Sequence, residues 1–207
     1  MTPFTVLKGG CVVMPVDNID TDQLIPARFM NTARSAGYGR YLFYDLRYEA
    51  IGEHITEFPL NKTDGSEVIL VAGNNFGCGS SREAAVYALL DYGFRAVVAR
   101  SFGDIFRNNA GKNGLLTVAL ADDAYSRFVR HLSRVPSDLV KIDLAAQVVE
   151  LATGTPLGFE IEPATKRKML LGIDDLAETL QYASMIEAFE TQYFQDKKWL
   201  VPDRTSP

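Results

Sequence analysis

The stretch that decides the fold runs from Val68 to Arg82 and reads VILVAGNNFGCGSSR. Its first five residues form a continuous apolar run, which is typical of a strand buried on both faces. The run leads into a glycine-rich loop, and a helix is predicted from about Ser81 to Tyr92, with Gly93 as its end. A buried strand that passes through a loop into a helix predicts an α/β domain with parallel strands.

The junction between this strand and this helix is a predicted anion site. The free N–H groups and the positive end of the helix dipole point to one place. Gly77 and Gly79 let the backbone bend and approach a ligand closely. The loop lacks the Gly-Lys-Ser/Thr ending of a P-loop, and Arg82 stands where a dinucleotide fingerprint has its third glycine. A guanidinium here favours a carboxylate ligand, because its N–H groups pair with two oxygens at once.

The same residues also have a purely structural interpretation. Ser80-Ser81-Arg82-Glu83 matches a capping box, with Ser80 as the N-cap and Glu83 three residues later. Such a cap contributes about 1 kcal/mol. Capping does not explain Arg82, the second serine or the long glycine-rich approach, so both interpretations stay open.

Outside this stretch the pattern predicts one domain over residues 1–207, with a C-terminal helix at about 174–195 and a loose tail after 199. Residues 31–65 are turn-prone and aromatic, and we expect little regular structure there. Further strands are predicted at 4–14 (broken at Gly9-Gly10), 96–99, 115–120, 139–144, 147–151 and 159–161, a turn at 154–158, and helices at 101–112 and 122–134.

The composition narrows the class of protein. The chain is 47% hydrophobic and 23% charged, which is ordinary for a soluble globular protein. Its net charge of −5 does not favour nucleic-acid binding. No apolar run is long enough to span a membrane, and the N-terminus does not resemble a signal peptide, so we expect a cytoplasmic protein. Two cysteines, Cys11 and Cys78, cannot hold an iron–sulfur cluster alone, so no metal or cofactor is expected on this chain.

Four segments carry a resemblance to a known family. The run from Gly73 to Glu83 resembles the signature of the swivelling domain of the aconitase superfamily. Residues 18–26 resemble its Asp-Thr-Asp motif, and residues 101–116 resemble the segment that follows the signature. Residues 172–175 resemble the end of an isopropylmalate isomerase small subunit. The likeness runs in order from residue 4 to about 195.

The resemblance implies a swivelling β/β/α domain with a mixed, centrally parallel sheet flanked by helices, and a site at the carboxyl end of the strand Val68–Ala72. It implies the small subunit of a hydro-lyase that isomerises 2-isopropylmalate and 3-isopropylmalate through 2-isopropylmaleate in leucine biosynthesis. The partner would be a large subunit that carries a [4Fe–4S] cluster, as a heterodimer or larger assembly. The alternatives are a related hydro-lyase acting on homoaconitate, citraconate or methylmalate, and a non-catalytic anion-binding module.

The resemblance also assigns residue roles. Ser80 matches the base that removes a proton beside a carboxylate, and Asp22 is the second catalytic residue. Substrate binding is assigned to Arg82, Ser81 and Gly79 in the loop, and to Thr21 and Arg34. An Asx-type turn remains an alternative for Thr21 and Asp22, and a solvated side chain for Arg34. Cys78 is expected to be a small packed side chain.

Two positions depart from the family pattern. After Glu83 the family continues His-Ala-Pro-Trp, whereas this chain has Ala84-Ala85-Val86-Tyr87, and Ala110 stands where a cysteine is usual. Ala84 removes a polar group near the predicted site. These departures leave open a paralogue with another 2-hydroxy diacid substrate, or reduced activity. Residues 31–65 are expected to set which alkyl group is accepted.

Overall fold

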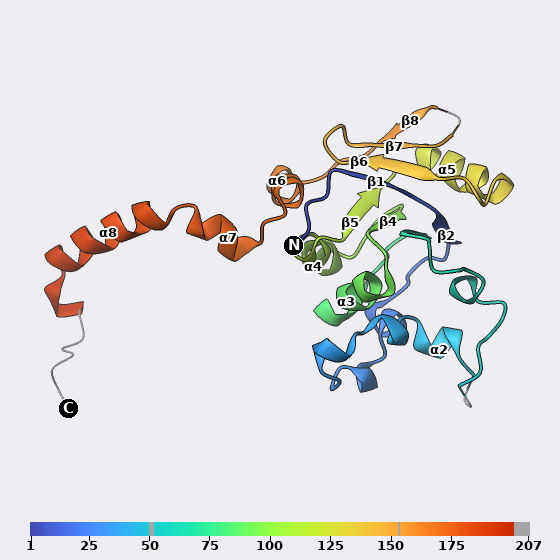
Figure 1. Ribbon diagram of the computed structural model, residues 1–207, viewed down its shortest axis with the longest axis horizontal. Helices are drawn as coiled ribbons and strands as arrows, with labels where there is room; N and C mark the ends of the chain where they lie inside the picture. Colours follow the sequence, from blue (N-terminus) through green and yellow to red (C-terminus); the bar gives the residue numbers. More distant parts are fainter. Residues whose placement is uncertain (50–51, 153, 201–207) are drawn as a thin grey trace. The chain divides into compact units, whose positions relative to one another are not determined.

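The computed structural model describes residues 1–49, 52–152 and 154–200, and its contacts divide the chain into two units (Figure 1). The first unit is Met1–Gly172, and the second begins at Ile173. Each unit is described by itself. No helix in the described part of the chain is long and apolar enough to cross a membrane.

A parallel sheet lies at the centre of the first unit. Its strands are β2 (Cys11–Met14), β3 (Ile69–Ala72), β4 (Ala96–Ala99) and β5 (Leu116–Ala119), in that order. Every residue of β3 and β4 is buried, which explains their uninterrupted apolar sequence. The α/β class with parallel strands at its centre is therefore confirmed.

The two faces of this sheet belong to separate cores. Leu70 and Ala72 of β3 face a core that includes α3 (Glu83–Tyr92) and α4 (Asp104–Asn113). Ile69 and Val71 face a core with α5 (Asp122–Arg134) and an antiparallel sheet. That sheet has the order β1-β6-β7-β8. Its strands are β1 (Val6–Gly9), β6 (Val140–Asp143), β7 (Val148–Glu150) and β8 (Pro156–Gly158). The parallel and antiparallel strands thus occupy two sheets instead of one, and α6 (Pro163–Leu171) completes the unit.

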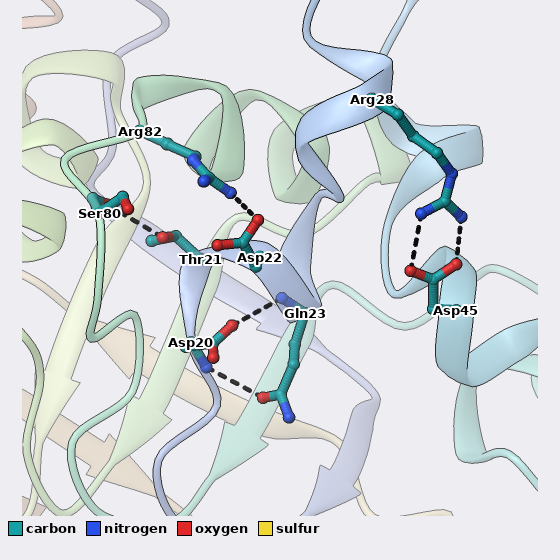
Figure 2. Close-up of polar contacts among 8 residues, drawn as sticks. All are labelled: Asp20, Thr21, Asp22, Gln23, Arg28, Asp45, Ser80 and Arg82. Atoms are coloured by element: carbon teal, nitrogen blue, oxygen red, sulfur yellow. Dashed lines mark hydrogen bonds and ion pairs between the residues drawn. The ribbon is translucent and has the colours of Figure 1, made fainter.

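The long connection from β2 to β3 contains short helical turns and isolated bridges at Asp20 and between Tyr48 and His54. Residues 31–65 thus have little regular structure, as predicted, although residues 50 and 51 lie outside the described residues. The helical turns are α1 (Thr21–Leu24), α2 (Tyr44–Arg47) and 3-10 turns at Ala27–Phe29, Arg34–Ala36, Gly39–Tyr41 and Pro59–Asn61. Leu42 and Phe43 are fully buried in the core beneath α3. An ion pair between Arg28 and Asp45 joins a 3-10 turn to α2 (Figure 2). The connection is therefore packed on the domain rather than detached from it.

Several predicted boundaries were wrong. The predicted turn at 154–158 contains the strand β8. Residue 153, just before it, is not described. The strand predicted at 159–161 is absent, because these residues lie outside the named strands. In the second unit the single predicted helix is two, α7 (Asp175–Leu180) and α8 (Ala183–Asp196). Asp174 caps α7 by accepting a hydrogen bond from the N–H of Ala177 at 2.7 Å. Most of the predicted loose tail, residues 201–207, falls outside the described residues.

Candidate active site

The loop after β3 is held in place by hydrogen bonds to the residues that follow the two neighbouring strands, β2 and β4. The N–H of Gly73 donates to the carbonyl of Val16 at 3.0 Å. The next N–H, of Asn74, donates to the Asp17 carboxylate at 2.6 Å. Asn75 has a positive φ of 55°, and its N–H donates to the Ser101 hydroxyl at 2.8 Å. The chain that follows β2 and the chain that follows β4 therefore fix the start of the loop at the carboxyl end of the sheet, as predicted.

The two glycines of the loop serve different needs. Gly77 has φ 73°, and a Cβ there would lie 2.2 Å from the ring of Phe106, so conformation and space both exclude a side chain. Gly79 has φ 90°, but a Cβ there would meet its neighbours at an ordinary 3.6 Å. Backbone conformation alone favours glycine at position 79.

Residues 20–22 meet this loop across almost 60 residues of sequence (Figure 2). The N–H of Thr21 donates to the Cys78 carbonyl at 3.0 Å, and its hydroxyl donates to the Ser80 carbonyl at 3.0 Å. Thr21 is 2% exposed, so its own side of both bonds is buried. Asp22 forms an ion pair with Arg82. The structure thus brings together Thr21, Asp22, Ser80 and Arg82.

Asp20 caps α1, a helix of four residues. Its carboxylate accepts from the N–H of Gln23 at 2.7 Å, and the Gln23 side chain accepts from the N–H of Asp20 at 3.0 Å. This is a complete capping box, and the Asp-x-x-Gln spacing could have revealed it in the sequence. The cap turns Thr21 inward and Asp22 toward Arg82.

The capping box predicted at Ser80 was wrong. Helix α3 begins at Glu83, its N-cap is Arg82, and no side chain caps it. Glu83 instead accepts a hydrogen bond from Asn113 at the end of α4, at 2.7 Å. The Ser80 carbonyl is already bound by Thr21 and by the N–H of Arg82 at 2.8 Å, which holds Ser80 outside the helix.

The Ser80 and Ser81 side chains are exposed, and no described residue hydrogen-bonds to either hydroxyl. Ser80 is therefore fixed by its backbone while its hydroxyl faces solvent, three residues before the first turn of α3. The Arg82 side chain is 18% exposed, and its guanidinium offers further N–H donors besides the one that meets Asp22. This arrangement can bind a carboxylate and present a hydroxyl beside it.

Arg34 does not join this cluster. It pairs with Asp91 near the end of α3, and its guanidinium lies 4.4 Å from the centre of the Tyr87 ring. Asp91 also accepts from the N–H of Tyr38 at 2.7 Å. Asp91 lies eight positions after Glu83, which is about 12 Å along the axis of α3. A substrate-binding role for Arg34 remains a prediction.

The two departures from the family pattern lie in the core. Ala84 is 9% exposed and Ala110 is fully buried, both in the core between the parallel sheet and its two helices. Their methyl groups therefore pack between helices and sheet. Tyr87 is half-buried on α3, and burial and then the Glu83 charge raise the pKa of its hydroxyl.

The described residues do not fit a metal centre. They contain no group of three or more histidine, cysteine or acidic side chains placed to hold a metal. Cys11 is half-buried, and desolvation, then the charges of Asp138 and Glu67, raise the pKa of its thiol to about 12. A neutral thiol is a poor ligand for a cluster. Cys78 is half-buried in the loop and free, in agreement with a small packed side chain.

A parallel sheet whose glycine-rich loop leads into a helix, with an arginine at the junction, is the arrangement of an α/β domain suited to binding a small anion. A family model described as the aconitase C-terminal domain matches residues 1–123. The 3-isopropylmalate dehydratase small subunit of Roseiflexus sp. (strain RS-1) is 48% identical over 192 residues, which are 92% of this chain and 94% of that protein. The protein of the same description from Caulobacter vibrioides (strain NA1000 / CB15N) is 41% identical over 201 residues, covering 97% of this chain and 99% of that one.

A solved structure gives the same result. The crystal structure of 3-isopropylmalate dehydratase from Methanocaldococcus jannaschii has a TM-score of 0.63 and 27% sequence identity, and the match covers 89% of this chain and 99% of that chain. The chain belongs to the family of 3-isopropylmalate dehydratase small subunits, within the aconitase superfamily.

Proposed function

We propose that this chain is the small subunit of a hydro-lyase that interconverts 2-isopropylmalate and 3-isopropylmalate in leucine biosynthesis. The reaction removes water to form 2-isopropylmaleate and adds it back with the hydroxyl on the neighbouring carbon. The observation that carries the proposal is the meeting of Thr21, Asp22, Ser80 and Arg82 at the carboxyl end of β3. Membership of the family supports the choice of substrate.

In this proposal Ser80 moves the proton. Its ionised oxygen takes a proton from the carbon beside a substrate carboxylate, and that electron pair forms the double bond as hydroxide leaves the next carbon. Rehydration reverses these steps on exchanged carbons. Serine is a weak base, so the alkoxide needs stabilisation. The unpaired N–H groups and positive dipole end of α3, three residues away, supply it.

Arg82 binds a substrate carboxylate in this proposal, and Asp22 orients it. A guanidinium carries five N–H donors in a planar fork, so one edge can remain on Asp22 while another receives the substrate. Ser81 lies between Ser80 and Arg82 with an exposed hydroxyl that can donate to the same carboxylate. Thr21 positions Ser80 by donating a hydrogen bond from its hydroxyl to the Ser80 carbonyl.

The remaining chemistry belongs to a partner. We infer a large subunit that carries a [4Fe–4S] cluster, because the resemblance to the aconitase superfamily implies one. The described residues of this chain offer no site for it. When bound there, such a cluster supplies Lewis-acid assistance to loss of the substrate hydroxyl. The assembled enzyme is expected in the cytoplasm, and this chain alone is expected to be inactive.

An anaerobic assay tests the proposal. The purified chain is mixed with its cognate large subunit, and the absorbance of the unsaturated intermediate is followed with 2-isopropylmalate, citraconate and homoaconitate offered separately. Turnover of 2-isopropylmalate only when both subunits are present is the expected result. Preference for citraconate or homoaconitate would refute the proposed substrate but leave the proposed dehydration and rehydration in place. No turnover by a complex with an intact cluster would leave a non-catalytic anion-binding module.

A further inference from the structure

The second unit displays a continuous apolar stripe on α8 and the residue before it. Tyr182, Ile186, Phe189 and Tyr193 recur at spacings of four, three and four residues, which places them on one face of a helix. Met185 lies beside them and is 70% exposed, and Phe189 is 66% exposed. No residue of α7 or α8 is buried, and both helices are fully described. The stripe therefore has no covering surface within the second unit.

Such a stripe indicates a binding surface. Single exposed apolar residues are common on proteins, but contiguous apolar patches mark interaction sites. The rings of Phe189 and Tyr193 stack with centroids 5.5 Å apart, which makes one large apolar ridge. A helix of 14 residues is also marginal alone in water and gains most of its stability from packing of its apolar face.

The charge of this segment narrows the kind of partner. Residues 173–200 contain six carboxylates and two lysines, which leaves a net charge of −4. Helices that lie on membranes carry lysine and arginine on their polar face, so an anionic lipid surface does not fit. A nucleic acid is excluded by the same sign. Pairing of this segment with that of a second copy would bring like charges together. The fitting partner is a protein groove with an apolar floor and a basic rim.

We propose that the stripe Tyr182–Ile186–Phe189–Tyr193 is a docking surface for the large subunit. This inference rests on the proposed function, which supplies that partner. The alignment with the Caulobacter small subunit takes in 201 residues of this chain and leaves six outside. Most of the segment after Gly172 is therefore common to both small subunits. A segment that the two small subunits share, acidic and apolar in this chain, fits the partner that small subunits have in common.

The test measures affinity with two matched variants of the full chain. Ile186→Ala with Phe189→Ala removes the centre of the stripe, and alanine keeps the helix because it has the highest helix propensity. Gln195→Ala changes an exposed residue on the opposite face of α8 and is the control. Dissociation constants for the cognate large subunit are measured by sedimentation velocity under anaerobic conditions, and circular dichroism checks helix content.

We expect the double variant to raise the dissociation constant by about 100-fold, because buried aromatic and aliphatic side chains contribute most of the binding free energy of an interface. The control should stay within about twofold of the unchanged chain. At saturating large subunit the double variant should regain the full turnover number, since neither residue belongs to the proposed site. A third variant, Glu187→Gln with Glu190→Gln, should reduce the salt dependence of binding.

If the unchanged chain forms an active enzyme and the double variant binds the large subunit as tightly as the control does, the inference is overturned. A dimer of this chain alone that the double variant abolishes would also overturn it, by assigning the stripe to a second copy. Absence of both complex and turnover for the unchanged chain would instead refute the proposed function on which the inference rests.

Discussion

The hydroxyl of Thr21 offers a sharp test of how Ser80 is positioned. Thr21→Val keeps the shape of the side chain and removes its 3.0 Å hydrogen bond to the Ser80 carbonyl. That carbonyl still accepts from the N–H of Arg82 at 2.8 Å, so no buried acceptor is left without a partner. The loss of stability should therefore be that of one hydrogen bond, about 1 kcal/mol. For a chain of this size that lowers the melting temperature by roughly 2–4 °C.

The effect on catalysis should exceed the effect on stability. Ser80 has no side-chain partner among the described residues, so its backbone bonds alone fix the hydroxyl. A displacement of about 1 Å from productive geometry can lower a rate about 100-fold. We expect the turnover number of Thr21→Val to fall at least about tenfold, with little change in the Michaelis constant. Thr21→Ser restores the hydroxyl and should recover most of the rate.

Thr63→Val is the matched control. Its hydroxyl donates to the Leu60 carbonyl at 3.1 Å in the connection between β2 and β3, apart from the cluster around Ser80. It should show a comparable or smaller loss of stability and an unchanged turnover number. The assay is the anaerobic turnover of 2-isopropylmalate with saturating large subunit, together with thermal unfolding. Equal turnover numbers for Thr21→Val and Thr63→Val would refute positioning through the Ser80 carbonyl.

Other perturbations give further predictions. Ser80→Ala should abolish turnover yet leave stability within about 0.5 kcal/mol, because no helix cap is lost; measurable turnover would remove Ser80 as the base. Arg82→Lys should chiefly raise the Michaelis constant, since an ammonium cannot reproduce the fork, and unaltered kinetics would contradict this. Iodoacetamide at pH 8, followed by mass spectrometry, should label Cys78 before Cys11, whose thiol pKa is raised to about 12; the reverse order would be evidence against a protected Cys11. The hydrogen bonds from the backbone and then the side chain of Asn74 lower the pKa of Asp17, so its contribution is complete above the unfolded value of about 3.9 and is lost as pH falls through the lower folded value. Asp17→Asn should therefore flatten the loss of stability in acid unfolding experiments, and an unchanged acid profile would argue against this bond.

The parts of the fold that were predicted correctly depend on local patterns. The apolar run at Ile69–Ala72 marks a strand buried on both faces, and the structure buries all four residues. The helix Asp122–Arg134 has the predicted bounds because its acidic first turn and its amphipathic face are local properties. Gly77 was also predicted to let the loop bend, and its φ of 73° confirms that conformation. The Phe106 ring beside it is a tertiary contact that the local pattern does not contain.

The incorrect predictions arose where the local sequence allows more than one structure. Ser80 and Asp20 both match a capping box, but only Asp20 forms one. The Ser80 carbonyl is held by Thr21, and that contact keeps Ser80 outside the helix. The split of the final helix into α7 and α8 has no strong breaker in the sequence, since Gln181 and Tyr182 tolerate a helix.

The sequence by itself determined the buried strands, the glycine loop and the junction between strand and helix that carries Arg82, because periodicity and backbone conformation act over a few residues. Only the tertiary structure decided which distant groups meet there. Asp22 reaches Arg82 across 60 residues, and Arg34 instead reaches Asp91 across 57. These partners depend on how β2, β3 and β4 align side by side, since the ends of parallel strands bring remote loops to one edge of the sheet.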